Sequence, residues 1–249
     1  MSNPYKVSII TASYNAEKYI PRLVSSLLSQ YNSNFEWVVV DGESTDKTLE
    51  ILKKVSGINL IVDSRPDSGV YDAFNRAVQI ASGDYILFLG ADDFLVCDLS
   101  NIVYNFSDLN TLYYGDVYMP MRHKIIGGKF SKLRLAIHNI CQQAIFYPRS
   151  VFAKYKFNTD YPLWADYLLN IQCFNDSEFS CHYLPVLVSY FNDYSGMTAF
   201  KNDEMFLKNK LSIIYNNFPK NVFFQFLLAT YPVTLISRLK SIKLKKYMS

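Results

Sequence analysis

The amino-acid sequence predicts an α/β protein, in which a mostly parallel sheet carries helices on both faces and a helical extension follows at the C-terminal end. Three observations lead to this prediction. In the first hundred residues, short apolar runs alternate with segments whose apolar residues recur every three or four positions. Half of the 249 residues are hydrophobic and 19% are charged, which suits a folded chain with a large core. Beyond Asp203 the pattern becomes helical and basic.

The first part of the chain predicts strands and helices in strict alternation, which is typical of a parallel sheet. The first helix has Ile20, Leu23 and Leu27 on one face, and the second is capped by Ser44 or Thr45 and runs through Lys53. A third helix covers residues 70–81. The apolar runs expected to form the strands are Val7–Thr11, Trp37–Val40, Leu60–Val62 and Tyr85–Leu89.

From about residue 100 the pattern is looser. Leu112–Met119 and Lys124–Phe130 are expected to be antiparallel strands, and Trp164–Phe174 is expected to be a helix. Further strands are expected at Ala144–Tyr147 and Pro185–Phe191. We therefore expect residues 1–100 and 101–203 to form the two halves of a single domain, and residues 204–249 to form a tail.

The net charge of +3 conceals an asymmetry between the body of the chain and its tail. Residues 1–204 contain 17 Lys/Arg and 22 Asp/Glu, whereas residues 205–249 contain eight Lys/Arg and no acid. The apolar stretch 222–237 is shorter than the about 20 residues that span a bilayer, and basic residues follow it. This pattern favours peripheral attachment to a membrane surface, with a core-packing helix as the alternative. Nucleic-acid binding is not indicated, because the basic run is short and the body is acidic.

The cysteines and the N-terminus favour a cytoplasmic protein, and the tail would place it at the inner face of the plasma membrane. The N-terminal sequence MSNPYKVSII contains no recognisable signal peptide. The cysteines lack the CxxC spacing of metal sites, which favours free thiols in a reducing compartment. They are Cys97, Cys141, Cys173 and Cys181.

Polar side chains follow each of the four expected parallel strands. Since ligands of such sheets bind beyond the carboxyl ends of the strands, these segments should form one site. Asp92 and Asp93 are adjacent carboxylates that would repel each other unless a cation neutralises them. Mn²⁺ or Mg²⁺ gripping a diphosphate is the economical explanation, and a helix N-cap is the alternative. Asp41 could accept hydrogen bonds from a nucleobase or ribose, and a turn aspartate beside Gly42 is the alternative. Tyr14 could stack on a base, and a packed aromatic is the alternative.

Candidates also lie outside the strand ends. Asn75 and Arg76 share a helix face near its start, which suits a pyrophosphate or ribose. Asp166 follows Leu163-Trp164-Ala165, and apolar surroundings would raise its pKa towards that of a general base. Gln142 and Gln143 could bind sugar hydroxyls. The alternative for each is an ordinary surface or turn residue.

Four segments together resemble the family 2 glycosyltransferases, inverting enzymes with the GT-A fold. They are VSIITASYNAEKYI, EWVVVDGESTDKT, PDSGVYDAFNRAVQIASGDYILFLGADD and WADYLL, in the family's order. The matches are dense over residues 5–95 and loose over 110–200, and they look most like bacterial enzymes that build O-antigen, capsule or exopolysaccharide units. The resemblance implies that residues 1–100 bind a nucleotide sugar and that residues 101–203 bind the acceptor.

The resemblance also implies roles for single residues. Donor-binding residues would be Tyr14 at the base, Asp41 at the uracil or ribose, the turn acid Asp67, Asn75 and Arg76 at the ribose and diphosphate, and Asp92. Asp92 is the last acid of the family's DxD motif, with Asp93 beside it as a second metal ligand, and Asp166 would be the catalytic base. Three departures stand out: Gly90 replaces the first acid of DxD, Arg65 stands where relatives often have Glu, and Gln142 stands where close relatives often have His.

The resemblance therefore implies transfer of glucose, galactose or an N-acetylated equivalent from a UDP-sugar to a hydroxyl of a saccharide. A polyprenyl-diphosphate-linked glycan is the expected acceptor, and Mn²⁺ or Mg²⁺ the expected cofactor. Two other hypotheses remain open at this point. One is a sugar-1-phosphate nucleotidyltransferase, although residues 12–17 lack its basic, glycine-rich phosphate loop. The other is an inactive, transferase-like binding or scaffold protein.

Overall fold

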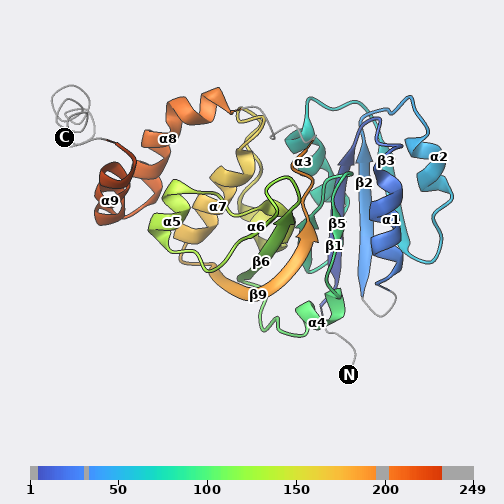
Figure 1. The fold of residues 1–249 in the computed structure, drawn as a ribbon, viewed down its shortest axis with the longest axis horizontal. Helices are drawn as coiled ribbons and strands as arrows, with labels where there is room; N and C mark the ends of the chain where they lie inside the picture. The colour runs from blue at the N-terminus through green and yellow to red at the C-terminus, as the bar shows by residue number, and fades with distance from the viewer. Residues whose placement is uncertain (1–4, 31–33, 195–201, 232–249) are drawn as a thin grey trace.

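A computed structural model of the chain describes residues 5–30, 34–194 and 202–231 (Figure 1). Within these ranges one nine-stranded sheet runs in the order β3-β2-β1-β4-β8-β6-β9-β5, and β7 pairs with β6. The parallel part contains β1 (Val7–Ser13), β2 (Phe35–Asp41), β3 (Asn59–Ser64) and β4 (Tyr85–Phe88). All four strands were predicted. Their register places Ser13 beside Asp41 and Asp41 beside Ser64, so three strands end together at one edge.

The second half of the sheet is mixed. It contains β5 (Phe94–Leu95), β6 (Thr111–Met119), β7 (Lys124–Ile126), β8 (Ile145–Pro148) and β9 (Ser180–Tyr190). β8 runs antiparallel to both β4 and β6, whereas β9 runs parallel to β6. The predicted antiparallel pairing of β6 and β7 is confirmed. β7 ends earlier than predicted, because Gly127 and Gly128 adopt positive φ angles that an extended strand does not allow.

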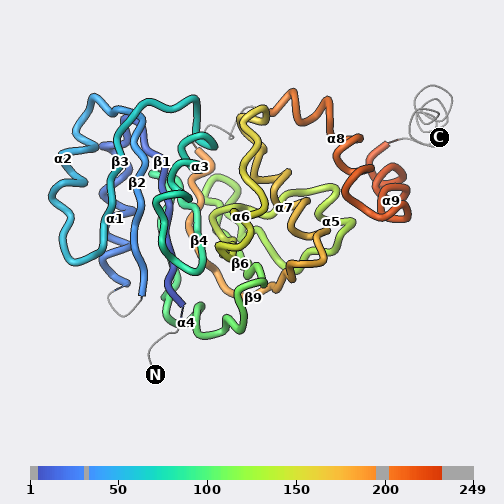
Figure 2. The backbone as a smooth tube through the Cα atoms, turned by 180° about the vertical axis from the view of Figure 1, so that it is seen from behind, coloured from blue at the N-terminus to red at the C-terminus, as the bar shows by residue number. Residues whose placement is uncertain are grey.

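Helices cover both faces of the sheet, as predicted. One face carries α1 (Ile20–Leu28), α2 (Thr48–Lys53) and α4 (Leu99–Val103), which pack on β1, β2 and β4. The other face carries α3 (Val70–Ile80), α5 (Lys132–Ile137), α6 (Ser150–Lys154) and α7 (Ala165–Asn175). Figure 2 shows α1 and α2 at one end of the molecule and the C-terminal helices at the other. Cys97, Cys141, Cys173 and Cys181 are free thiols, as expected.

The predicted start of the second helix is wrong. α2 begins at Thr48, without a side-chain cap. The Ser44 hydroxyl donates instead to Asp41 Oδ1 at 2.6 Å, and the Thr45 N–H donates to Asn15 Oδ1 at 2.9 Å. These groups thus join the loops that follow β1 and β2. The short helices α4, α5 and α6 were not predicted, since five or six residues are too few to establish a helical period.

The described part of the tail forms α8 (Glu204–Asn217) and α9 (Lys220–Thr230). Val222, Phe223 and Phe226 of α9 are buried in the core, so core packing, the alternative to membrane attachment, is correct for these residues. Phe224 and Leu228, four positions apart, remain 43% and 67% exposed. No helix in the described ranges has the length and hydropathy needed to cross a membrane. The basic run that begins at Arg238 lies outside the described residues.

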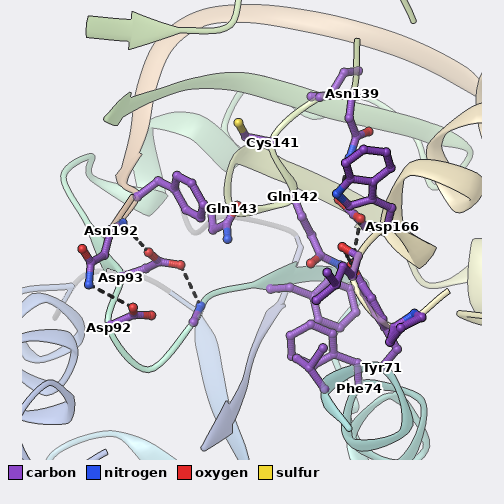
Figure 3. A pocket seen from close by; sticks show the side chains of 18 residues that line it. Tyr71, Phe74, Asp92, Asp93, Asn139, Cys141, Gln142, Gln143, Asp166 and Asn192 are labelled. Carbon is purple, nitrogen blue, oxygen red and sulfur yellow. Dashed lines mark hydrogen bonds between the residues drawn. The ribbon is translucent and has the colours of Figure 1, made fainter. Parts of the chain in front are cut away.

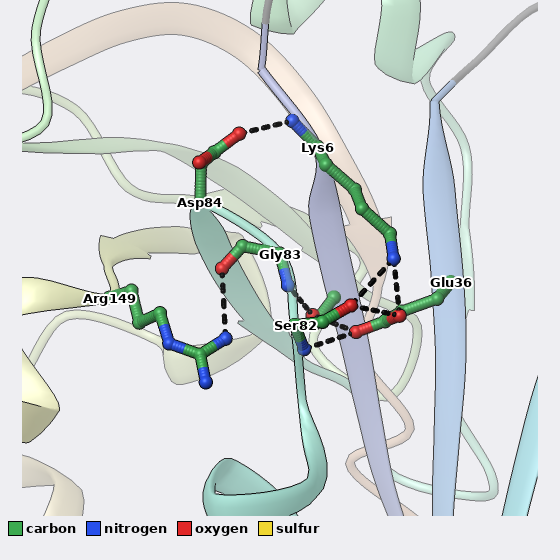
Figure 4. Close-up of polar contacts among 7 residues, drawn as sticks. Lys6, Glu36, Ser82, Gly83, Asp84 and Arg149 are labelled. Carbon is green, nitrogen blue, oxygen red and sulfur yellow. Dashed lines mark hydrogen bonds and ion pairs between the residues drawn. The ribbon is translucent and has the colours of Figure 1, made fainter.

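A polar network fastens β1, β2 and the start of β4 at the edge opposite the candidate site (Figure 4). The Glu36 side chain is 1% exposed and forms an ion pair with Lys6 at 2.5 Å. Ser8 and Ser82 also donate hydrogen bonds to it. Burial alone would raise the pKa of this carboxyl group, but these hydrogen bonds lower it from 4.5 to about 2. The ionised form of Glu36 therefore stabilises the fold.

Glu36→Gln is expected to lower the free energy of unfolding at pH 7 by about 3 kcal/mol. Because the folded-state pKa lies below the unfolded one, the contribution is present above pH 4.5 and disappears as the pH falls towards 2. Urea denaturation at several pH values measures it. Glu50→Gln, a change at an exposed position of α2, is the control. A loss in Glu36→Gln that stays constant down to pH 3 would contradict this explanation.

Candidate active site

Hydrogen bonds tie together the loops after β1, β2 and β3. Asp41, at the end of β2, is fully buried. Its Oδ1 accepts from the hydroxyls of Ser13 and Ser44, and its Oδ2 accepts from the Ser44 N–H and the Ser64 hydroxyl. Asp41 therefore holds three loops in place, and its oxygens contact the donor only if one of these partners moves.

Tyr14 and Asp67 lie at the surface of these loops. The Tyr14 side chain is 66% exposed, which leaves its ring available for stacking. A side chain on Gly42 would approach Asp67 Oδ2 to 3.0 Å and the Tyr14 ring to 3.5 Å. The three residues thus border one surface, and the glycine keeps it open. The structure brings together Tyr14 and Asp67, as the sequence predicted.

Asn75 and Arg76 of α3 are occupied by contacts within the protein. The Asn75 amide both donates to and accepts from the Phe157 backbone at 2.9 Å. Arg76 forms an ion pair with Asp63 at 3.0 Å and donates to the carbonyl oxygens of Arg65 and Pro66. Arg76 therefore shapes the loop that carries Asp67. Asn75 and Arg76 thus support neighbouring loops in this structure, and their contacts with a nucleotide sugar stay a prediction.

Asp92 and Asp93, in the loop after β4, differ in their exposure and in the hydrogen bonds of their carboxylates. Asp92 is half-buried, and its Oδ2 accepts from the Asn192 side chain at 2.9 Å. Asp93 is 2% exposed, and its two oxygens accept from the backbone N–H groups of Gly90 and Asn192. Burial raises the pKa of both carboxyl groups, and the charge of Asp92 raises that of Asp93 further. Asp93 therefore anchors the loop.

A cavity of about 260 Å³ joins Asp92 to Asp166 (Figure 3). Its walls come from α3, the loop after β4, the segment before β8, the start of α7 and the end of β9. The volume is below the about 300 Å³ at which ligand pockets usually begin. It therefore suits one sugar-sized group, while Tyr14, Asp41 and Asp67 lie outside it.

Asp166, in the first turn of α7, is 8% exposed and lines this cavity. Tyr71 donates to its Oδ1 at 2.8 Å, and Asn139 donates to its Oδ2 at 2.7 Å. Burial raises the pKa of Asp166 to about 6, although both hydrogen bonds oppose the shift. A carboxylate with this pKa is ionised at neutral pH and remains basic enough to take a proton.

In Figure 3, Gln142 and Gln143 lie between Asp166 on one side and Asp92 and Asp93 on the other. Gln142 is 7% exposed and lines the cavity, yet its Nε2 has no hydrogen-bond partner among the described residues. A buried donor without an acceptor is costly, so a ligand oxygen is the natural partner. The Gln143 side chain instead bonds Asp93. Only Gln142 is therefore carried forward as an acceptor-binding candidate.

A second hollow, of about 470 Å³, borders the other side of Asp92. Lys18 and Arg22 contribute positive charge to it. Arg22 lies over the rings of Phe94 and Tyr190, at 5.3 and 5.9 Å from their centroids. Neither cation was predicted to be in the site, because Lys18 lies in an exposed turn just before α1 and Arg22 lies on the exposed side of that helix. They place positive charge near the carboxylate expected to bind a metal–diphosphate group.

Asn139, Asn192 and Tyr71 also contact the two carboxylates Asp92 and Asp166, and these contacts were not predicted. Asn192 directly follows an apolar strand, and that position was the available signal. Tyr71 lies in the helix predicted over residues 70–81 and is buried. Nothing in the sequence around Asn139 distinguishes it from a turn residue.

The residues present fit a divalent cation held by one carboxylate. No cluster of three or more His, Cys, Asp or Glu occurs in the described ranges. Mn²⁺ and Mg²⁺ can bind through one or two carboxylates when phosphate oxygens complete the shell. A side chain at position 90 would approach Asp92 Oδ1 to 2.9 Å and Asp93 Oδ2 to 2.8 Å. Gly90 thus leaves room at both carboxylates. Asp92 is half-buried and is the more accessible of the two, whereas Asp93 is buried and both of its oxygens already accept backbone hydrogen bonds.

Comparisons with known proteins show the family of the chain. Residues 8–120 match the model of Glycosyl transferase family 2. A PGL/p-HBAD biosynthesis glycosyltransferase of Mycobacterium bovis is 39% identical over 210 residues, 81% of this chain and 82% of the relative. An Escherichia coli protein, the UDP-Glc:alpha-D-GlcNAc-diphosphoundecaprenol beta-1,3-glucosyltransferase WfaP, is 31% identical over 175 residues, 65% of this chain and 70% of the relative.

Among solved structures, S. aureus TarS in complex with UDP-GlcNAc superposes with a TM-score of 0.69. The match covers 89% of this chain and 71% of the solved TarS chain, residues 1–349, at 21% identity, and it supports the GT-A fold alone. Together, the relatives and the family match overturn the nucleotidyltransferase hypothesis. The chain belongs to glycosyl transferase family 2 and is a glycosyltransferase.

Proposed function

We propose that the protein transfers glucose, galactose or an N-acetylated equivalent from a UDP-sugar to a hydroxyl of a lipid-linked saccharide, with inversion at the anomeric carbon. The observation that carries this proposal is the single cavity shared by Asp166, a buried carboxyl group with a pKa of about 6, and Asp92. The name of the E. coli relative describes such a donor and such an acceptor, and TarS has been solved with UDP-GlcNAc. Surface-polysaccharide synthesis is the proposed context.

The proposed reaction is one displacement. Asp166 takes the proton of the acceptor hydroxyl, whose oxygen bonds to the anomeric carbon as the bond to the diphosphate breaks and UDP leaves. Gln142 Nε2 donates a hydrogen bond to a sugar hydroxyl. Tyr14 stacks on the base, while Asp41 and Asp67 shape the loops around it. A bound Mn²⁺ or Mg²⁺, held by Asp92, would supply positive charge for the leaving diphosphate.

The test is UDP release from a panel of UDP-sugars, with and without Mn²⁺, using a synthetic lipid diphosphate–GlcNAc as acceptor. We expect release to need the acceptor and to be fastest with one UDP-hexose or UDP-N-acetylhexosamine, and NMR of the product to show an inverted anomeric centre. GDP-mannose is the control donor. No release from any UDP-sugar, or a retained configuration, would contradict the proposal.

We further propose that the protein associates peripherally with the cytoplasmic leaflet, through α9 and the basic run after it. Exposed Phe224 and Leu228 support this, as does the absence of acid after Glu204. Deleting residues 240–249, or substituting serine at both apolar positions, is expected to lower co-sedimentation with vesicles containing anionic lipid. Leu109→Ser, another exposed apolar position, is the control. Unchanged co-sedimentation of both variants would refute the proposal.

A further inference from the structure

A chain of hydrogen bonds runs from β8 to the carboxyl group of Asp166. The Tyr147 hydroxyl donates to Asn170 Oδ1 at 2.7 Å. Asn170 Nδ2 donates to Asn139 Oδ1 at 2.9 Å, and Asn139 Nδ2 donates to Asp166 Oδ2 at 2.7 Å. Tyr147 and Asn170 are fully buried and do not line the cavity, so they reach Asp166 only through Asn139.

The contacts of Asn170 set which atoms donate and which accept along this chain of hydrogen bonds. Asn170 Nδ2 also lies 3.4 Å from the carbonyl oxygen of Ile140, which can only accept a hydrogen bond. The Asn170 amide must therefore turn its NH₂ group towards Ile140 and Asn139, and its oxygen towards Tyr147. Asn139 then presents its oxygen to Asn170 and its NH₂ group to Asp166. A donor at this position favours the carboxylate over the carboxylic acid.

Apart from Asp92 and Asp93 across the cavity, the titratable groups packed around Asp166 are uncharged at neutral pH. Tyr71 comes from α3, Cys141 from the segment before β8, Tyr147 from β8 and Tyr167 from α7. Burial raises the pKa of each of them, for Cys141 to about 12. Lys210 of α8 lies over the Tyr167 ring, and no cation in the described ranges forms an ion pair with Asp166. Neutral donors alone therefore offset the burial of this carboxylate.

We propose that Tyr147, Asn170 and Asn139 are positioning residues, which hold the Asn139 NH₂ group on Asp166 and so keep this base deprotonated and oriented at neutral pH. This inference rests on the proposed role of Asp166. Without the Tyr147 hydroxyl, the Asn170 oxygen loses its donor, and only the long 3.4 Å contact with Ile140 still favours the present orientation, so both amides can turn over. The Asn139 oxygen would then face Asp166, and it would favour the protonated acid.

The decisive variant is Tyr147→Phe, which removes one buried oxygen and keeps the packing of the ring. We expect the acid limb of the kcat/KM profile to move up by roughly half to one pH unit. Activity should return to the wild-type level at pH 9, and KM for the donor should not change. Asn139→Leu removes the donor itself, so its limb should move by about one to two pH units.

Tyr167→Phe is the matched control, because this buried hydroxyl donates to the Leu135 carbonyl and takes no part in the chain. Its acid limb should stay in place. A loss of activity in Tyr147→Phe that is equal at every pH would indicate a merely structural role and would overturn the inference.

A direct titration separates this inference from the proposed function. In protein labelled with ¹³C at the aspartate carboxyl carbons, the Asp166 signal is assigned by its absence from Asp166→Asn. We expect it to titrate near pH 6 in the wild type and at higher pH in Tyr147→Phe and Asn139→Leu. An unmoved titration in both variants would overturn the hydrogen-bond chain even if Asp166 is the base. Full activity of Asp166→Asn would remove the base assignment even if the titration moves.

Discussion

Asp166→Asn is expected to lower kcat by about a hundredfold or more and to leave donor affinity unchanged. Asparagine has the same shape as aspartate but cannot take the proton of the acceptor hydroxyl. The fold should tolerate the change, because Tyr71 can turn its hydroxyl hydrogen to the Leu163 carbonyl oxygen, 3.0 Å away. Steady-state rates with acceptor, together with UDP-sugar binding by calorimetry, measure both effects.

Asp160→Asn is the control for this variant, since it removes an exposed carboxylate six positions earlier in the chain. It should have wild-type kcat. The wild-type rate should also fall about tenfold per pH unit below pH 6, because protonation removes the base, and should be level above pH 7. A kcat for Asp166→Asn within a few-fold of wild type would rule out this base.

Much of the fold follows from the sequence, and the reason is periodicity. β1 to β4 and the helices between them repeat apolar residues over enough positions to fix their type. β5 and the helices α4 to α6 are two to six residues long and were missed. The start of α2 was misplaced because Ser44 and Thr45 suit either a helix cap or a loop, and Asn15 and Asp41 decide between them.

In the candidate site, the sequence predicted where several residues lie but not which contacts they make. Strand ends predicted that Tyr14, Asp41, Asp67 and Asp92 lie at one edge, since parallel strands end at one edge whatever the details of packing. The sequence could not reveal how each polar group is used. Asn75 and Arg76 have side chains that could bind the ribose and diphosphate of a nucleotide sugar. Their hydrogen bonds go instead to the backbone at Phe157, Arg65 and Pro66.

The same limit applies to the residues around Asp166. Asn139 approaches it from a segment 27 positions away, and Asn192 reaches Asp92 from 100 positions away. Contacts over such separations depend on how the two halves of the sheet pack. No local pattern records them, so the residues that support the two carboxylates appear only in the folded structure.

Asp92→Asn is expected to weaken UDP-sugar binding in the presence of Mn²⁺ by about tenfold or more, since a carboxylate–metal contact is worth several kcal/mol and 1.4 kcal/mol is a factor of ten. Without Mn²⁺ the variant and the wild type should bind the donor equally. The melting temperature should change little, because an asparagine oxygen can still accept from Asn192. Calorimetric titration with and without metal measures the difference.

The neighbouring carboxylate provides the control. Asp93→Asn would point an NH₂ group at one of two backbone N–H donors, those of Gly90 and Asn192, in a site that is 2% exposed. It should lower the free energy of unfolding by about 1–3 kcal/mol. The folded fraction of Asp93→Asn should still bind the UDP-sugar more tightly when Mn²⁺ is present. If Asp93→Asn removed the Mn²⁺ response while Asp92→Asn kept it, the two roles would be reversed, and Asp93 would be the carboxylate that holds the metal.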